Sequence, residues 1–363
     1  MIQRHQHKTY LDIIRILCIF FVVYNHTPLY HAPYSIPPLE INIFHLIVNI
    51  GIKIAVPLFF MISGALLLEK EEPLRKLFTH RVWRFVVVIL LFCLIQCSFF
   101  WWKNDMEPSL KGYLTACFNP TRFSVSGLGG GKTRSLGAAA YWFLYAYLAF
   151  LIALPLLRSM ARNMDFKCYV YLIGVQLSLQ FIIPGAYYIV FGMAPSIPLL
   201  QYTPLLTTPV LYPLLGYFLE KRVDFTKVSW KVLGVIGCIA FVSILSSALL
   251  CIHAAGYAKC KIPDLPWFLG CILPLCIFVY LGIKKVFEKA IIGSSVSGIL
   301  SLMGGSVFMV MILDNIIRKS VATLFANYET DILPSIYVVL ITVLGGMVAG
   351  LIVKQIPWLK RIF

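Results

Sequence analysis

The sequence predicts an all-α, polytopic transmembrane helical bundle with about ten spans. Composition is the first observation: 60% of the 363 residues are hydrophobic and only 13% are charged, whereas soluble domains are about one quarter charged. The second is that apolar runs of about 20 residues recur along the chain, which is the length that crosses a bilayer core as a helix. Helices are favoured because backbone polar groups in lipid must be satisfied within the spanning segment.

The apolar runs indicate one membrane domain over residues 1–363. Its N-terminal motif region covers about 10–157 and its C-terminal spans cover about 168–353. The sixth run contains Pro204, Pro209 and Pro213, so a broken or tilted helix is expected there. The ten runs lie at about 10–29, 44–68, 82–102, 137–157, 168–190, 203–219, 230–251, 266–287, 296–317 and 332–353.

The basic residues set the expected orientation. With the N-terminus inside, 20 of the 31 Lys and Arg residues fall on the cytoplasmic side and 9 outside, as the positive-inside rule requires. Both termini are therefore expected in the cytoplasm of a multi-pass protein of the plasma (inner) membrane. The net charge of +16 then reflects topology, and no nucleic-acid partner is expected because no basic face of a soluble domain is formed.

The cysteines predict neither a metal site nor a redox motif. Most of the ten lie inside apolar runs, with no CxxC pair or zinc-like spacing. They are interpreted as small packing residues. Cys251 and Cys260 flank a predicted outer loop, where a disulfide stays open as an alternative.

The first apolar run carries a polar stripe. Arg15 and His26 are eleven residues apart, which places them about 20° apart around a helix, and Asp12 lies one turn before Arg15 and can pair with it. Charged residues at mid-span cost roughly 2.5–3.5 kcal/mol each, so they are functional candidates. Two alternatives stay open: Arg15 as an anchor that reaches the lipid headgroups, and His26 as a hydrogen-bonded core residue.

Five motifs follow one another along the chain: Leu11–Arg15 with His26, Val56–Gly64, Arg81 with Arg84, Tyr141–Tyr145, and Leu215–Tyr217. In this order they resemble the motifs of the acyltransferase family 3 membrane proteins, and the expected ten spans agree with that family. The resemblance implies an enzyme that moves an acetyl or other short acyl group from acyl-CoA to a hydroxyl of a cell-envelope polysaccharide or its lipid-linked precursor.

The resemblance and the chemistry together suggest catalytic roles. His26 has an ordinary pKa near 6.5 and suits removal of a proton from an acceptor hydroxyl, or it acts as a transient acyl-carrying nucleophile. Asp12 and Arg15 would position the reactants or help to bind the donor. Arg75, Arg81 and Arg84 would bind the phosphates of acyl-CoA, with inside-positive topology and binding of membrane lipids as the alternative. No metal is expected.

Two positions depart from the family pattern. Tyr141 stands before Trp142 where the family often has His, and Asp314 stands where a late motif usually ends in His. Asp314 indicates either lost function or a carboxylate that orients His26. Trp142, Tyr141, Lys53 and Asp314 are candidates for acceptor binding, although Trp142 also fits an interfacial aromatic belt and Lys53 could simply reach outward. A glycan transporter or exporter is the alternative function, since a broken sixth span would suit it.

Overall fold

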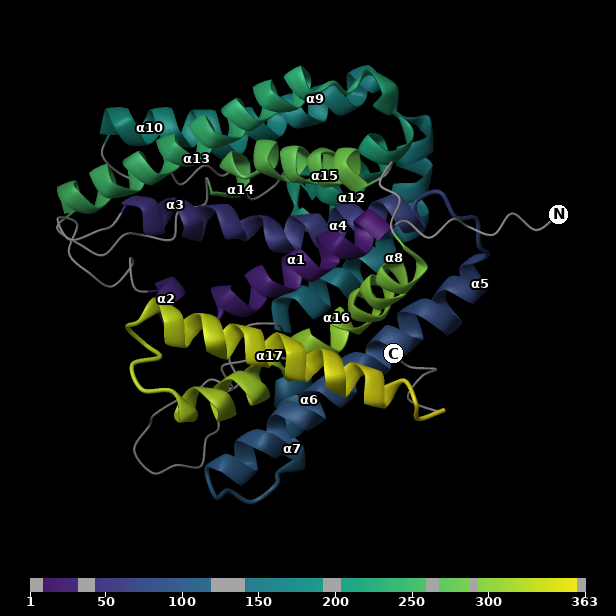
Figure 1. The fold of residues 1–363 in the computed structure, drawn as a ribbon. Coiled ribbons are helices and arrows are strands. Elements are labelled where there is room, and N and C mark those ends of the chain that lie inside the picture. The colour runs from purple at the N-terminus through teal and green to yellow at the C-terminus, as the bar shows by residue number, and fades with distance from the viewer. Residues whose placement is uncertain are drawn as a thin grey trace.

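The computed structural model describes residues 9–31, 43–118, 141–191, 204–258, 268–287 and 293–357. All regular secondary structure in these ranges is helical, which confirms the all-α prediction (Figure 1). Within these ranges, seven helical stretches are long and apolar enough to cross a membrane: Ile43–Leu67, Leu74–Lys103, Trp142–Asn163, Phe166–Phe191, Trp230–His253, Ser294–Leu324 and Ile332–Val353.

The other three predicted runs hold shorter helices. These are α1 (Thr9–Asn25), α12 (Thr208–Lys221) and α15 (Leu273–Phe287), of 17, 14 and 15 residues. The count of ten membrane crossings therefore remains a prediction. The remaining helices are α2 (Pro28–His31), α3 (Ile43–Gly51), α4 (Ala55–Leu67), α5 (Leu74–Lys76), α6 (Trp83–Lys103), α7 (Leu110–Phe118), α8 (Tyr141–Asn163), α9 (Phe166–Leu177), α10 (Ile183–Phe191), α13 (Trp230–Ala258), α14 (Phe268–Cys271), α16 (Ser294–Val321) and α17 (Ile332–Val353).

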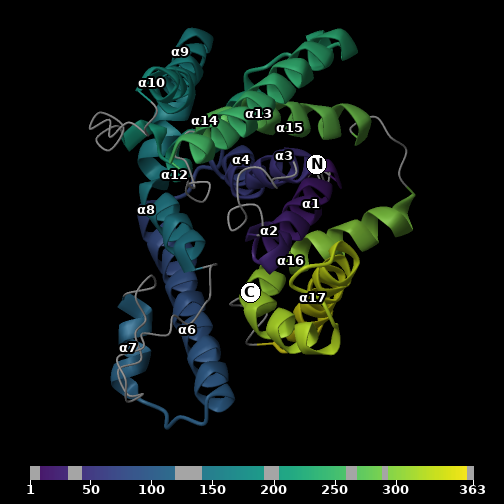
Figure 2. The same ribbon diagram turned by 90° about the vertical axis from the view of Figure 1, so that its left-hand side faces the viewer.

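Helix α1 is central. It contacts α4 and α15 on one side and α16 and α17 on the other (Figures 1 and 2). α1 and α16 run parallel, because Thr9 at the start of α1 bonds to Ser297 at 3.2 Å and His26 beyond its end contacts Asp314. A buried network in which Tyr10 and Lys284 both bond to Glu220 joins α1 to α15 and α12. These polar contacts thus fix the register of α1, the helix that ends directly before His26.

Helices α4 and α12 each contribute a glycine to the point where they cross. A Cβ atom on Gly64 would overlap the Pro213 carbonyl oxygen, and one on Gly216 would overlap the Met61 carbonyl oxygen. Small residues let backbones approach this closely. The sixth run is broken as predicted: a separate 3₁₀ turn spans Pro204–Leu206, and α12 begins only at Thr208.

The third helical stretch begins earlier than predicted. The sequence placed its start near residue 82, but the helix is continuous from Leu74 through α5, a π-helical segment Leu77–Val82, and α6. The correction has a physical reason, since Pro73 in an extended conformation can start a helix ahead of the apolar run. The π-helical segment contains His80 and Arg81, and such segments frequently lie at functional sites.

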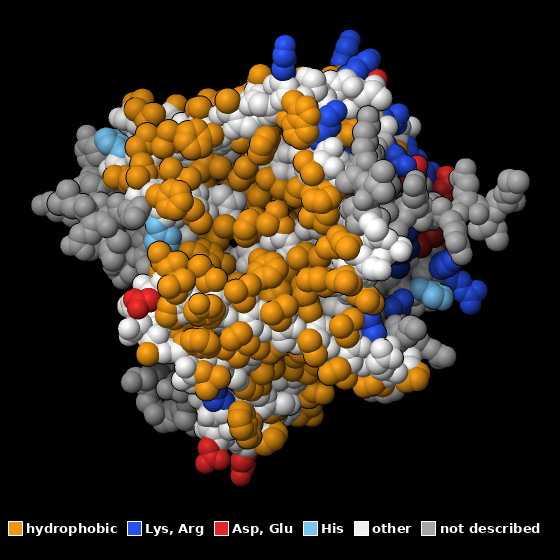
Figure 3. Space-filling model, in the orientation of Figure 1, with side chains coloured by type: hydrophobic (Ala, Val, Ile, Leu, Met, Phe, Trp, Pro, Cys, Tyr) orange, Lys and Arg blue, Asp and Glu red, His pale blue; other side chains and the backbone are white. Residues whose placement is uncertain are grey.

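The surface shown in Figure 3 fits a bilayer. Apolar side chains cover the middle of this face, and Lys and Arg side chains gather mainly along its right and upper edges. On α17, Leu344, Val348 and Ile352 are more than half exposed. Large exposed apolar areas are unusual in soluble monomers, and together with the seven long apolar helices they indicate a multi-pass membrane protein.

Candidate active site

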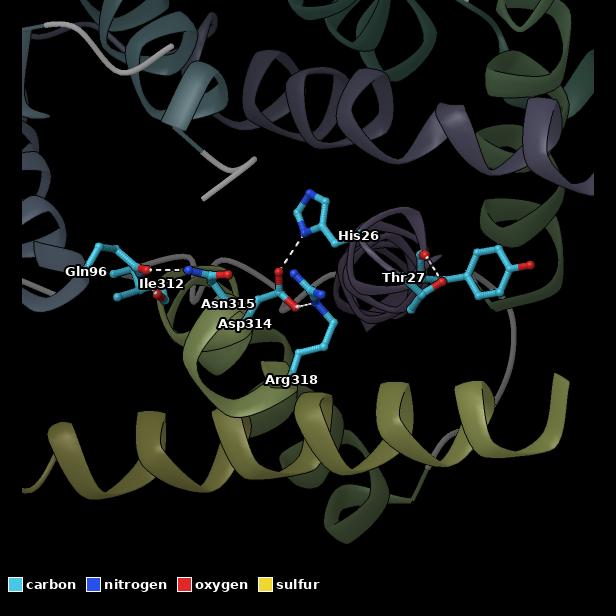
Figure 4. Close-up of polar contacts among 8 residues, drawn as sticks. His26, Thr27, Gln96, Ile312, Asp314, Asn315 and Arg318 are labelled. Atoms are coloured by element: carbon cyan, nitrogen blue, oxygen red, sulfur yellow. Dashed lines mark hydrogen bonds and ion pairs between the residues drawn. The ribbon is translucent and has the colours of Figure 1, made fainter. Parts of the chain in front are cut away.

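His26 faces Asp314 across the α1–α16 contact. Its Nδ1 lies 2.6 Å from Asp314 Oδ2, and the two side chains are only 8% and 4% exposed (Figure 4). His26 follows the last residue of α1, and the backbone N–H groups of His26 and Thr27 donate to the Val23 and Tyr24 carbonyls. The helix end therefore fixes the position of the imidazole.

Asp314 is held from its own helix as well. Arg318, one turn later on α16, donates from Nε to Asp314 Oδ1 at 3.2 Å. Each carboxylate oxygen thus has a partner, His26 on one side and Arg318 on the other (Figure 4). The two contacts together fix the carboxylate between His26 and Arg318.

Helix α6 supports the same turn of α16. Gln96 donates to the Ile312 carbonyl at 2.9 Å, and Asn315 donates to the Gln96 side-chain oxygen at 2.9 Å (Figure 4). Gln96 and Asn315 are both buried. These two bonds flank Asp314 in sequence and hold its backbone against α6.

The predicted Asp12–Arg15 pair is present. Arg15 donates to Asp12 Oδ1 at 2.7 Å, with the Asp12 side chain buried and that of Arg15 29% exposed. Gly304 of α16 lies directly against Asp12, because a Cβ there would come within 2.6 Å of Oδ1. The pair therefore lies nearer the start of α1, separate from the His26–Asp314 contact.

A cavity of about 500 Å³ opens beside Arg15. Its basic lining residues are Arg15, Lys70, His80, Arg81 and Arg84. Most of its other lining residues are apolar, and Ser63 and Tyr147 add hydroxyl groups. The apolar wall includes the rings of Phe85 and Phe308, whose centroids are 5.9 Å apart. This volume lies in the range of small-molecule sites, and the combination suits a ligand with an anionic head and a less polar arm.

The cavity leads toward His26 without including it. Its lining on α1 comprises Arg15 and Ile19, and on α16 it ends at Met311. Asp314 lies one turn beyond Met311, and His26 lies two turns beyond Ile19. Because α1 and α16 are parallel, the His26–Asp314 pair follows the inner end of the cavity along the same two helices.

Comparison with known proteins decides the family. Over residues 8–354 the chain matches a family described as an acyltransferase domain. The chain belongs to the acyltransferase 3 family. No curated protein and no solved structure matches the chain. Membership makes this protein an acyltransferase that transfers groups other than aminoacyl groups.

In this acyltransferase, Glu72 organises the basic lining of the cavity. Its carboxylate accepts from Arg81 Nε at 2.8 and 3.0 Å and from Arg158 at 2.8 Å. Burial opposes ionisation of Glu72, but the hydrogen bonds and charges of Arg158 and Arg81 outweigh it and lower the pKa of Glu72 below its ordinary 4.5. The sequence analysis missed Glu72 and Arg158, although acids at 69, 71 and 72 directly after an apolar run offered a signal.

The other predicted site residues have different positions. Arg81 and Arg84 line the acyltransferase cavity, whereas Arg75, Lys53 and Trp142 do not. Arg75 is exposed before the π-helical segment, because it lies in the first turn after Pro73. Trp142 is 49% exposed and packs against Phe143, which does line the cavity. Helix α8 begins at Tyr141, but the Tyr141 side chain lies outside the described residues, as does Cys260.

Proposed function

We propose that this acyltransferase moves an acetyl or other short acyl group from acyl-CoA to a hydroxyl of a cell-envelope polysaccharide or its lipid-linked precursor, with His26 as the general base. The observation that carries the proposal is the 2.6 Å contact between His26 Nδ1 and Asp314. A carboxylate accepts hydrogen bonds, so it favours the tautomer with the proton on Nδ1. The lone pair is then on Nε2, which points away from Asp314 in Figure 4.

The proposed reaction follows from that tautomer. His26 Nε2 takes the proton of the acceptor hydroxyl while the oxygen attacks the thioester carbonyl. An ester bond forms, the carbon–sulfur bond breaks, and the imidazolium returns its proton to the departing CoA sulfur. Asp314 stabilises the imidazolium between the two transfers, because the ion pair is buried. Arg318 holds the other oxygen of Asp314 in place throughout.

The cavity would hold the donor. Arg81, Arg84 and Lys70 offer charge to the CoA phosphates, and the forked guanidinium suits phosphate oxygens. The apolar inner wall would take the thioester arm toward Met311 and onward to His26. In the orientation that the Lys and Arg distribution predicts, the basic mouth faces the cytoplasm and His26 lies toward the outer side of the plasma membrane, where envelope acceptors would arrive.

The test measures release of CoA thiol and acylated product by the purified full-length chain, with acetyl-CoA and an envelope glycan fraction. We expect His26→Ala to give background rates. Asp314→Asn should lower kcat by about 10²–10³-fold with little change in the donor KM, since general-base catalysis is worth about that much.

Asp224→Asn is the matched control, because Asp224 is an exposed loop carboxylate paired with Lys227; it should keep the full rate. Full activity of His26→Ala would exclude the proposal. An acyl group trapped on His26 in rapidly quenched protein would replace the base mechanism with the carrier mechanism. Glycan flux without release of CoA thiol would instead support a transporter.

A further inference from the structure

Arg318 is a buried cation with unused hydrogen-bonding capacity. Arg318 is 8% exposed, and its Nε donates to Asp314. A guanidinium has five N–H donors. Within the described residues the terminal nitrogens of Arg318 have no carboxylate or carbonyl partner, so they are suited to binding a group that the chain itself does not supply.

The Tyr328 hydroxyl lies beside this guanidinium. Tyr328 is 8% exposed, and its hydroxyl is buried. It lies within hydrogen-bonding reach of the Arg318 guanidinium. A buried hydroxyl beside a buried guanidinium that still has N–H donors to offer is arranged to share one acceptor group with it.

Further positive charge surrounds the two residues. Lys319, the next residue on α16, is partly buried and lies within electrostatic range of Arg318 and of Lys103 at the end of α6. Among the described residues, Asp314 is the carboxylate that attracts Lys319, and it also pairs with His26. Glu329, near Tyr328, is exposed. Like charges close together at low dielectric repel strongly, so a bound anion would relieve the excess.

We propose that Arg318, Tyr328 and Lys319 form a binding site for an anionic group, a carboxylate or phosphate, of the acyl acceptor. The inference rests on the proposed function and adds the acceptor's chemical class: an acidic glycan or a phosphate-bearing precursor. Because Arg318 and His26 hold opposite oxygens of Asp314, an anion on Arg318 would place a neighbouring sugar hydroxyl near the imidazole. A neutral acceptor would offer no anionic group for these side chains to bind.

Binding is tested without catalysis. The thermal midpoint of the full chain in neutral detergent is measured with sodium glucuronate, with inorganic phosphate, and with glucose plus sodium chloride at equal ionic strength. We expect either anion in excess to raise the wild-type midpoint by about 2–4 °C, and Arg318→Gln to lose the shift. Lys111→Gln, at an exposed basic residue on α7, is the control and should keep it. Equal midpoints in all solutions would overturn the site.

Acyl transfer then tests the role of the anion. A uronic-acid oligosaccharide is compared with the same oligosaccharide after reduction of its carboxylate to an alcohol. We expect kcat/KM to favour the acidic acceptor at least about tenfold, and Arg318→Lys to reduce that preference while leaving the donor KM unchanged. Equal transfer to both acceptors would overturn the inference and leave the proposed function standing.

Other outcomes separate the two proposals. Absence of transfer to any acceptor would remove the proposed function, and the midpoint measurements alone would then decide whether the anion site exists. A shift produced by phosphatidylglycerol in mixed micelles, but not by glucuronate or phosphate, would assign the residues to a lipid headgroup and overturn the acceptor site.

Discussion

The Glu72 carboxylate orients a basic side chain in the lining of the binding cavity. This carboxylate pairs both with Arg158 and with Arg81, which lines the cavity. Arg158 also donates to the Leu67 carbonyl at 3.1 Å. Arg158 is thereby bonded both to the carboxylate and to the end of α4. Arg81 is 32% exposed and has its Nε engaged by Glu72, which orients the guanidinium. Glu72 is therefore a positioning residue for the proposed donor site.

Replacing Glu72 with Gln should raise the donor KM about fivefold with little change in kcat, because a charge-assisted pair that orients Arg81 becomes a weaker neutral one. Initial rates against acetyl-CoA concentration measure this. Glu71→Gln is the control, since Glu71 is 82% exposed and pairs with Arg162 at the surface. A kcat loss at constant KM would assign Glu72 a different role.

The pKa of Glu72 also predicts how the stability of the fold depends on pH. The pKa of Glu72 is lower in the folded protein than its ordinary 4.5, so its ionised form stabilises the fold above that pH. This stabilisation is lost as the pH falls from about 4.5 through the folded pKa. The thermal midpoint of the wild type should consequently drop more steeply than that of Glu72→Gln over this interval. Parallel pH profiles of the two proteins would contradict the prediction.

At the scale of elements, the α4–α12 crossing depends on two glycines that meet the partner backbone. Gly64 lies against Pro213 and Gly216 lies against Met61, three residues before the opposite glycine in each case. The obstacle to a larger side chain is backbone, which cannot rotate away as a flexible side chain can. Any Cβ at these positions must therefore separate the helices. α4 also packs on α1, so the separation would reach the helix that carries Arg15 and His26.

Gly64→Ala or Gly216→Ala should destabilise the protein by about 3 kcal/mol or more, at the upper end of overpacking effects. Heating in detergent followed by size-exclusion chromatography measures the surviving fraction. Gly234→Ala is the matched control, because a Cβ there meets nothing within 4 Å and α13 is helical on both sides. It should be neutral or slightly stabilising, as Ala favours a helix over Gly. Wild-type survival of both crossing variants would disprove the close approach.

At the scale of the whole molecule, the start of α1 and the end of α17 lie at the same end of the bundle (Figure 1). The start of α16 lies at that end too, because α16 is parallel to α1. An even number of crossings between the two ends produces this arrangement. It agrees with the expectation of both termini on one side of the membrane, and the Lys and Arg distribution predicts that this side is the cytoplasm.

Cysteine labelling in intact cells tests this topology. In a background with the exposed Cys168 and Cys238, and Cys260 beside the predicted outer loop, replaced by Ser, a membrane-impermeant maleimide should label Glu329→Cys, before α17. It should not label Lys227→Cys, before α13, until the cells are opened. The two positions are both exposed, so they form a matched pair. Labelling of Lys227→Cys alone in intact cells would reverse the orientation.

The sequence by itself determined the helical class, the position of the apolar runs, the break at Pro204–Pro209 and the Asp12–Arg15 pair. These follow from local rules, because helix length, proline chemistry and pairing at a spacing of three residues act within one segment. The motifs that resemble the family also lie within short stretches of the chain, and the match over residues 8–354 confirmed the family.

Only the tertiary structure decided which carboxylate pairs with His26. Asp12 shares its helix and its stripe, yet the partner is Asp314, 288 residues later, because α16 packs parallel to α1. The cavity has the same origin: Arg15, Arg81 and Gly304 meet from three distant segments. Such contacts depend on how helices pack, which spacing along one helix does not encode. The same reason applies to the roles of Glu72, Arg158 and Arg318, because these roles depend on contacts that form only when the helices pack against one another.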